Sequence, residues 1–235
     1  MPAALAHRAA DTKFHGTRTV AGPSTRRGQP CRAGDGFEVR RISRLHAGAA
    51  PETIRRVVHL SNIQALCGAF DRREIAHDCF IEQCTRMIAA AIGCSRAGIW
   101  LFEDAADGRR LRCLGIYDSG KGRMALAPAE TSGQVGAYFA ALEQTGHVLA
   151  VEAGSHPATA GFFNEKLSAY GVRSLMASAF SVNGRLFGAF TCTEVDRTMN
   201  WTPAQLAMLK RIGTRVSLAL ANATRIAPAT LPMPL

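Results

Sequence analysis

Two strand-like segments joined by Asn183-Gly184 constrain the fold of this chain more than any other feature. Residues 173–182 and 185–195 are largely apolar and small, and alternate residues in each would face opposite sides of a sheet. An Asn-Gly pair between such segments is the strongest short signal for a two-residue hairpin turn, because both turn positions require a positive φ. The sequence therefore predicts adjacent antiparallel strands, in an antiparallel rather than a doubly wound sheet.

The other predicted elements are helices and shorter strands. Periodic apolar residues predict helices over 51–70, 71–92, 133–145, 158–170 and 203–223. Strand patterns are found over 96–103, 109–117 and 147–151, and residues 121–130 have the character of a loop. Asp71, followed by Glu74, is a potential capping box for the second helix, and Gly93 would end that helix. This order of elements predicts an α+β domain.

The last predicted helix begins with Thr202 as its N-cap and Pro203 at its first helical position. Its apolar residues recur at spacings of three and four: Leu206, Leu209, Gly213, Val216, Leu220 and Ala223. Two interpretations fit this seam, because the helix can pack on the sheet of its own domain or take part in a dimeric bundle. We expect a homodimer through the helices Pro51–Phe70 and Pro203–Ala223.

Both ends of the chain differ in composition from the predicted domain over 51–225. Residues 1–50 hold nine basic and three acidic residues and little to bury, so we expect a disordered basic tail. Upstream sequence from a misassigned start and a basic targeting arm are alternatives for this tail, and 226–235 form a proline-rich tail. Because the basic tail carries +6 of the net charge of +10, the domain is only mildly basic and no nucleic-acid partner is expected.

The sequence shows no membrane span or secretory signal, so we expect a cytoplasmic protein without a membrane partner. The seven cysteines include no C-x-x-C pair, which argues against a structural zinc site and favours buried thiols. A G-x-S-x-G elbow, a P-loop and an H-E-x-x-H motif are all missing from the sequence. We therefore expect neither a metal site nor an enzyme.

Several short motifs follow one another in the order and spacing of a GAF domain. They are Gly98 to Phe102, Tyr138 to His147, His156 to Thr159, Gly171 to Met176, Asn183 to Gly188 and Trp201 to Gln205. From about Phe70 to Ala223 the chain resembles GAF domains, most closely the sensory ones of bacterial diguanylate cyclases, phosphodiesterases and histidine kinases. The resemblance implies a PAS-like antiparallel sheet with the terminal helices on one face, and with short helices and loops covering a small-molecule pocket on the other.

The resemblance also implies a standalone sensory or regulatory module of bacterial signal transduction, which binds a small molecule and acts on a downstream signalling protein. It names no cofactor, since ligands of the family range from cyclic nucleotides and tetrapyrroles to haem, metal ions and small acids. Covalent bilin attachment is not expected, because residues 118–170 contain no cysteine, and a haem would need His147 or His156 as its axial ligand.

Two other functions stay open at this point. One is a ligand-free interaction module, which a pocket filled by Phe139, Phe163 and Met176 would favour. The other is a free methionine sulfoxide reductase, which needs an accessible thiolate and a resolving partner. Cys94 and Cys113, on either side of the first predicted hairpin, are the candidates for such a pair.

Ten residues are predicted to line the pocket, because they combine small polar side chains in apolar strands with aromatic walls from the covering helices. They are Tyr117, Phe139, His156, Thr159, Phe163, Ser174, Met176, Ser178, Thr191 and Thr193. A purely structural interpretation exists for each kind of residue. Hydroxyl groups can bond to nearby backbone, His156 can cap a helix, and the phenylalanines can belong to the core.

Overall fold

A computed structural model describes residues 52–106, 108–127 and 130–226 of the chain. The basic tail predicted over 1–50 lies outside these residues, and so does nearly all of the tail predicted over 226–235. The described part contains the whole predicted α+β domain except Pro51 and two short breaks.

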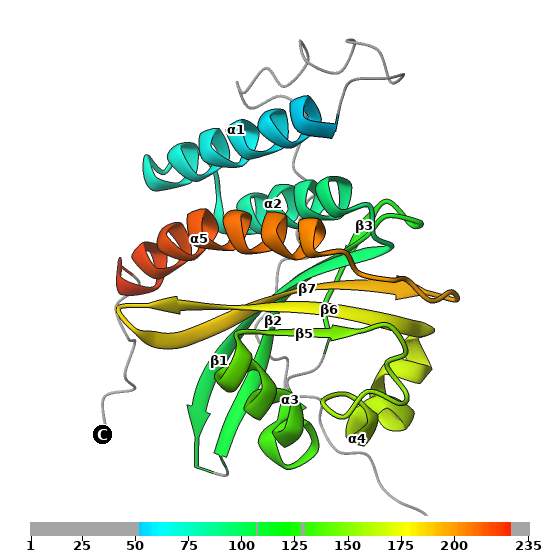
Figure 1. The fold of residues 1–235 in the computed structure, drawn as a ribbon. Helices are drawn as coiled ribbons and strands as arrows, with labels where there is room; N and C mark the ends of the chain where they lie inside the picture. The colour runs from blue at the N-terminus through cyan, green and yellow to red at the C-terminus, as the bar shows by residue number, and fades with distance from the viewer. Residues whose placement is uncertain (1–51, 107, 128–129, 227–235) are drawn as a thin grey trace, which may run out of the picture. The chain divides into compact units, whose positions relative to one another are not determined.

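A single antiparallel sheet forms the centre of the domain (Figure 1). Its strands are β1 (Arg96–Ala105), β2 (Gly108–Asp118), β3 (Arg123–Ala125), β4 (Glu130–Thr131), β5 (His147–Ala150), β6 (Val172–Val182) and β7 (Arg185–Val195). Their order across the sheet is β3-β2-β1-β7-β6-β5, and β4 pairs with β2. The central pairing of β1 with β7 joins the two hairpins. The two hairpins and the antiparallel sheet were predicted from the sequence, and all are confirmed.

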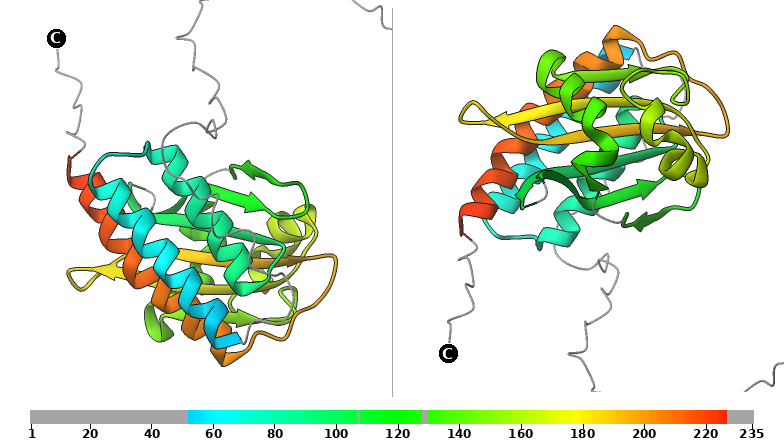
Figure 2. Two further views of the ribbon diagram at one scale, coloured as in Figure 1. Left: turned by 90° about the horizontal axis from the view of Figure 1, so that it is seen from above. Right: turned by 90° about the horizontal axis from the view of Figure 1, so that it is seen from below.

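Three long helices cover one face of the sheet (Figures 1 and 2). They are α1 (Glu52–Asp71), α2 (His77–Ile92) and α5 (Pro203–Ile226). α2 and α5 contact the strands, whereas α1 packs on α2 and α5. Phe80, Phe190 and Leu209 are fully buried between these layers, which makes this face the larger part of the hydrophobic core. None of the helices that the structure describes has both the length and the apolar composition of a membrane span.

The start of α5 is capped as predicted. The Thr202 hydroxyl accepts a hydrogen bond from the Gln205 amide (3.2 Å), and the Gln205 side-chain oxygen accepts one from the Thr202 amide (2.9 Å). This reciprocal pair satisfies two backbone donors that a helix N-terminus otherwise leaves unpaired. Leu209, Val216 and Leu220 are buried in the core of their own domain. The seam of α5 therefore packs on its own sheet, and it needs no second chain to bury it.

Shorter helical segments cover the other face of the sheet (Figure 2). They are α3 (Ser132–Thr145), α4 (Ala160–Phe162), a π-helical turn (Phe163–Leu167) and a 3-10 turn (Ser168–Tyr170). The continuous helix expected over 158–170 is thus wrong, and Gly171 ends the broken segment with a φ of 69°. Residues 121–130 also differ from the predicted loop, because β3 and β4 add two short strands to the sheet.

The boundary between the first two helices is another correction. Asp71 does not cap α2, because α1 continues through it. Arg73 then takes a left-handed conformation (φ 60°), and its amide and that of Glu74 donate to the carbonyls of Phe70 and Ala69. These bonds end α1, and α2 begins only at His77 without a side-chain cap. The Glu74 carboxylate pairs with Arg72 (2.6 Å), so it is not available to cap a helix.

Candidate functional site

A cavity of about 490 Å³ lies between the sheet and the segments that cover its second face. Its floor comes from β1, β2, β3 and β7, and its walls come from α3, the segment 162–175 and the loop residues next to β3. Most of its lining is apolar: Trp100, Leu111, Ile116, Val135, Tyr138, Phe162 and Leu175. A cavity of this volume and character holds one drug-sized molecule.

Two rows of residues cross the floor of the cavity from strand to strand. The first, here called the charged row, follows the register of β7, β1, β2 and β3: Thr193, Arg96, Asp118 and Arg123. The second, here called the small row, lies two residues further along each strand: Thr191, Gly98, Ile116 and Ala125. Residues directly opposite in a sheet project from the same face. All eight residues line the cavity.

Gly98 leaves the space that the small row requires. A Cβ atom at this position would lie 2.9 Å from the Thr191 hydroxyl oxygen and 3.1 Å from the Trp100 indole nitrogen. These two atoms are joined by a hydrogen bond, in which Trp100 Nε1–H donates to Thr191 Oγ1 (3.0 Å). The bond fixes the indole ring along the floor. It also leaves the hydroxyl hydrogen of Thr191 as a donor for a molecule in the cavity.

Arg96 is held at the charged end of the cavity by two hydrogen bonds. Its Nε donates to Asp118 (2.8 Å), and its Nη1 donates to the backbone carbonyl of Tyr170 (2.8 Å). The second bond connects β1 to the 3-10 turn that covers the cavity. Burial by itself would raise the pKa of Asp118, but its bonds to Arg96 and to the Lys121 amide, with the charges of both residues, hold this pKa below its ordinary value.

We expect Asp118→Asn to lower the free energy of unfolding by about 1.5–3 kcal/mol at neutral pH, since hydrogen bonds to a charged group are lost. The depressed pKa of Asp118 contributes stability that is complete above the unfolded pKa of about 4 and is lost as the pH falls through the lower folded value. Denaturant unfolding from pH 7 to pH 2.5 measures the difference in free energy of unfolding between wild type and variant. We expect this difference to shrink toward zero at acid pH. A difference that is constant over this range would contradict the role of the carboxylate charge.

Of the ten residues predicted to line the pocket, Thr191 and Thr193 lie on the cavity floor. Ser174, Met176 and Ser178 do not line the cavity. Met176 is fully buried in the core beneath the long helices, on the opposite face of the sheet. The expected face of β6 is therefore corrected: Leu175, from the alternate set, lines the cavity instead. Ser174 has a structural role, because its hydroxyl donates to the Val151 carbonyl and accepts from the Met199 amide (2.7 Å).

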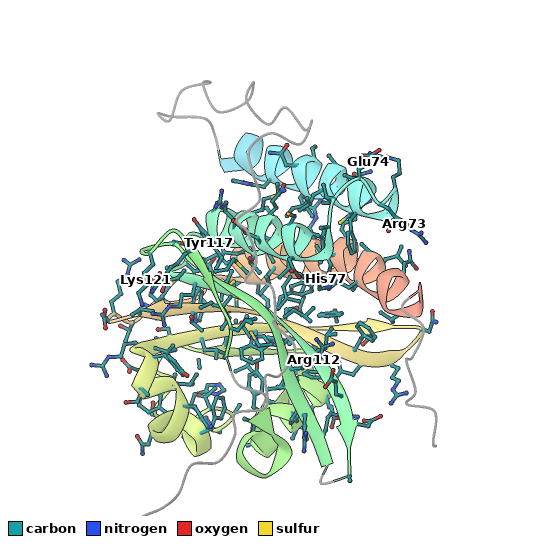
Figure 3. All side chains as sticks on the ribbon, turned by 180° about the vertical axis from the view of Figure 1, so that it is seen from behind. Arg73, Glu74, His77, Arg112, Tyr117 and Lys121 are labelled. Atoms are coloured by element: carbon teal, nitrogen blue, oxygen red, sulfur yellow. The ribbon has the colours of Figure 1, made fainter. Side chains whose placement is uncertain are left out.

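The other five predicted residues also lie away from the cavity lining. Tyr117 faces the long helices, where the Arg86 guanidinium lies 5.2 Å from its ring centroid (Figure 3). Phe139 packs against Phe102 in the core below the sheet, with ring centroids 5.1 Å apart.

The remaining three belong to the segment around α4, and their contacts are those of a folded loop. The Thr159 hydroxyl is buried and donates to the Ala153 carbonyl (2.6 Å). His156 Nδ1 accepts from the Ala158 amide (3.2 Å) in the turn before α4, which is a loop contact and does not cap the helix. The ring of Phe163 packs against Gly154, where a Cβ atom would lie 3.1 Å away.

The prediction missed the residues that β1 contributes. Arg96, Gly98 and Trp100 alternate with Ala97 and Ile99, and the first three line the cavity while the other two are fully buried in the core. A period of two, with charged, small and aromatic residues on one face, is visible in the sequence. This alternation would have predicted that Arg96, Gly98 and Trp100 share the face of the sheet that lines the cavity.

The described cysteines lie away from the cavity lining. Cys113 is opposite Trp100 in the first hairpin, whereas Cys94 precedes β1, so this pair is not adjacent as the sequence suggested. The thiol of Cys94 instead contacts that of Cys192. Burial raises the pKa of Cys67 to about 11, and it also raises the pKa values of Cys113 and Cys192. In the described part of the chain, no three His, Cys, Asp or Glu side chains are grouped for a metal ion.

An antiparallel sheet of this order, with helices from both ends on one face and a covered cavity on the other, defines the PAS-like class of α+β domains. The sequence profile of the GAF domain family matches residues 77–220, which is more than half of the chain. The chain therefore belongs to the GAF domain family. A search of curated protein sequences finds no significant match.

Solved structures with the same fold include domains of several functions. The phycocyanobilin-bound GAF domain of a cyanobacterial phytochrome has a TM-score of 0.57 at 15% identity, over 72% of this chain and 97% of that one. Free methionine-R-sulfoxide reductase from Neisseria meningitidis, in complex with its substrate, has a TM-score of 0.55 at 14% identity, over 76% and 98%. The GAF domain of an Acinetobacter phosphoenolpyruvate-protein phosphotransferase has a TM-score of 0.55 at 11% identity, over 74% and 97%.

Proposed function

We propose that this GAF domain is a sensory or regulatory module of the cytoplasm that binds one small molecule between its sheet and its covering segments. The observation that carries the proposal is the cavity of about 490 Å³, whose floor combines hydroxyl groups, charges and an aromatic ring. Phe139, Phe163 and Met176 do not fill it, which favours ligand binding over a ligand-free interaction module. The similar phytochrome domain was solved with phycocyanobilin bound. We propose that this chain likewise uses the fold to hold a small molecule.

A screen by thermal unfolding tests the proposal. A molecule that binds only the folded state stabilises it by about 2.7 kcal/mol at a hundred times its Kd. For a domain of this size, we expect a true ligand to raise the Tm by roughly 5–10 °C. A broad library of nucleotides, organic acids and aromatic metabolites that leaves the Tm unchanged throughout would count against a small-molecule sensor.

We further propose that the domain forms a homodimer through α1 and α5 and transmits its signal to a separate protein. The cavity and these helices lie on opposite faces of the same sheet, so a change on one face can alter packing on the other. Leu218 lies beside the seam on α5 and is 62% exposed, and it is the apolar side chain that a partner helix would cover. Analytical ultracentrifugation that finds only monomer at high protein concentration would refute the dimer.

We also propose that the protein is not an enzyme. Methionine sulfoxide reduction needs a thiolate at the bound substrate, but the described cysteines do not line the cavity. Several have raised pKa values because they are buried, which disfavours the thiolate at neutral pH. Clear thiol-dependent turnover of free methionine sulfoxide would overturn this proposal.

A further inference from the structure

The cavity floor changes from charged to apolar along the direction of β1. Arg96 lies in the charged row, Gly98 in the small row, and Trp100 follows at the apolar end. Successive residues on one face of a strand are about 7 Å apart, so the backbone positions of Arg96 and Trp100 are separated by about 13 Å. The indole nitrogen of Trp100 reaches back to Thr191 in the small row, so the aromatic surface begins next to the charged row. A molecule that spans this floor therefore meets charge at one end and an aromatic surface at the other.

The charged end is positive. Among the described residues that line the cavity, four are basic (Arg96, Lys121, Arg123 and Lys166) and one, Asp118, is acidic. The Asp118 carboxylate already accepts hydrogen bonds from Arg96 and from the Lys121 amide. Lys121, in the turn between β2 and β3 (Figure 3), and Arg123 form no ion pair within the described part of the chain. Positive charge thus remains uncompensated beside the charged row.

The apolar end offers aromatic surface without negative charge. Trp100, Tyr138 and Phe162 line it, and the rings of Tyr138 and Phe162 meet edge to face with centroids 5.7 Å apart. Burial raises the pKa of Tyr138, so its hydroxyl stays neutral at physiological pH. Aromatic side chains of this kind bind flat apolar groups by stacked or edge-to-face contacts.

We propose that the ligand is an organic anion with an aromatic body. Its acidic group, a carboxylate, phosphate or sulfonate, lies at the charged row beside Arg123 and Lys121, and its ring lies toward Trp100. The hydroxyl group of Thr193 lies in the charged row and that of Thr191 in the small row, where both can donate to polar atoms of such a molecule. This inference rests on the proposed function, because it names the ligand class of the same cavity.

Two fluorescent probes of one shape test the inference. 8-Anilinonaphthalene-1-sulfonate carries a sulfonate, and N-phenyl-1-naphthylamine has the same rings without it. The full-length protein is titrated with each probe at moderate ionic strength, and the ratio of the two Kd values measures the preference for the anion. We expect the sulfonate to bind about tenfold more tightly, because the net positive charge around Arg123 and Lys121 attracts it.

Two variants locate this preference. Arg123→Gln removes a cation from the charged row, and we expect it to reduce the ratio about fivefold while binding of the neutral probe is unchanged. Arg173→Gln is the matched control, because Arg173 is exposed on β6 and does not line the cavity. It lowers the net charge of the protein equally and is expected to leave both Kd values unchanged.

Each other outcome contradicts a defined part of the account. Equal binding of the two probes overturns the anion preference and leaves the proposed small-molecule site intact. A preference for the sulfonate that Arg123→Gln does not reduce, or that Arg173→Gln reduces equally, overturns the placement of the acidic group. Failure of both probes to bind the wild type contradicts the proposed function as well.

Discussion

Replacing Gly188 by alanine is expected to destabilise the domain by about 3 kcal/mol and to lower the Tm by roughly 6–12 °C. Gly188 lies in β7, at the centre of the sheet, opposite Leu101 of β1 and Phe180 of β6. A Cβ atom there would lie 2.2 Å from the Trp100 carbonyl oxygen and 2.6 Å from the Phe180 ring. The carbonyl belongs to the backbone, so no change of rotamer relieves the overlap. Thermal and denaturant unfolding measure the loss.

Gly136→Ala provides the control for this substitution. Gly136 lies in α3, and a Cβ atom there would have no neighbour within 4 Å. Alanine in a helix is favoured over glycine by roughly 0.5–1 kcal/mol, so a neutral or slightly stabilising effect is expected. If Gly188→Ala were as harmless as Gly136→Ala, the close approach of β1, β6 and β7 would not be as described.

Thr191→Phe is expected to weaken binding of either naphthalene probe more than tenfold. Thr191 lies in the small row at the middle of the cavity floor, and a phenyl group there occupies the space that a ligand ring needs. The variant loses the hydrogen bond from Trp100 but fills an open volume, so we expect it to remain folded. Fluorescence titration measures the affinity, and circular dichroism checks the fold.

The matched control for that experiment is Thr198→Phe. Thr198 is exposed in the loop after β7 and does not line the cavity, so the same change of residue leaves the cavity open. Its affinity for both probes is expected to equal that of the wild type. Equal weakening by both variants would mean that the probes bind an exposed surface rather than the cavity.

The sheet and its hairpins were predictable because their signals are local. Asn183-Gly184 lies at the turn between β6 and β7, with positive φ at both residues, and Thr202-Pro203 lies at the start of α5. Turn and cap residues determine the backbone conformation at their own positions and next to them. Their effect can therefore be predicted without knowledge of the rest of the fold. The end of α2 at Gly93, in a left-handed conformation, is another example.

Most of the cavity was not predictable, because it depends on which face of each strand turns away from the long helices. The alternation in β6 separates Ser174, Met176 and Ser178 from Leu175, but it does not say which set faces the cavity. The hydroxyl groups of Ser174 and Ser178 suggested that the first set lines the pocket. The Ser174 hydroxyl instead donates a hydrogen bond to the backbone carbonyl of Val151. The charged row is also assembled from four strands, and its members become neighbours only through the register of the sheet.

Native mass spectrometry of wild type and Thr191→Phe tests most directly whether the cavity binds one small molecule. Both proteins are measured as purified and again after addition of 8-anilinonaphthalene-1-sulfonate. We predict one small molecule per wild-type chain, either retained from the cell or supplied as the probe, and none on the variant. A wild type that carries no adduct under both conditions, or equal occupancy of wild type and variant, would contradict a ligand site in this cavity.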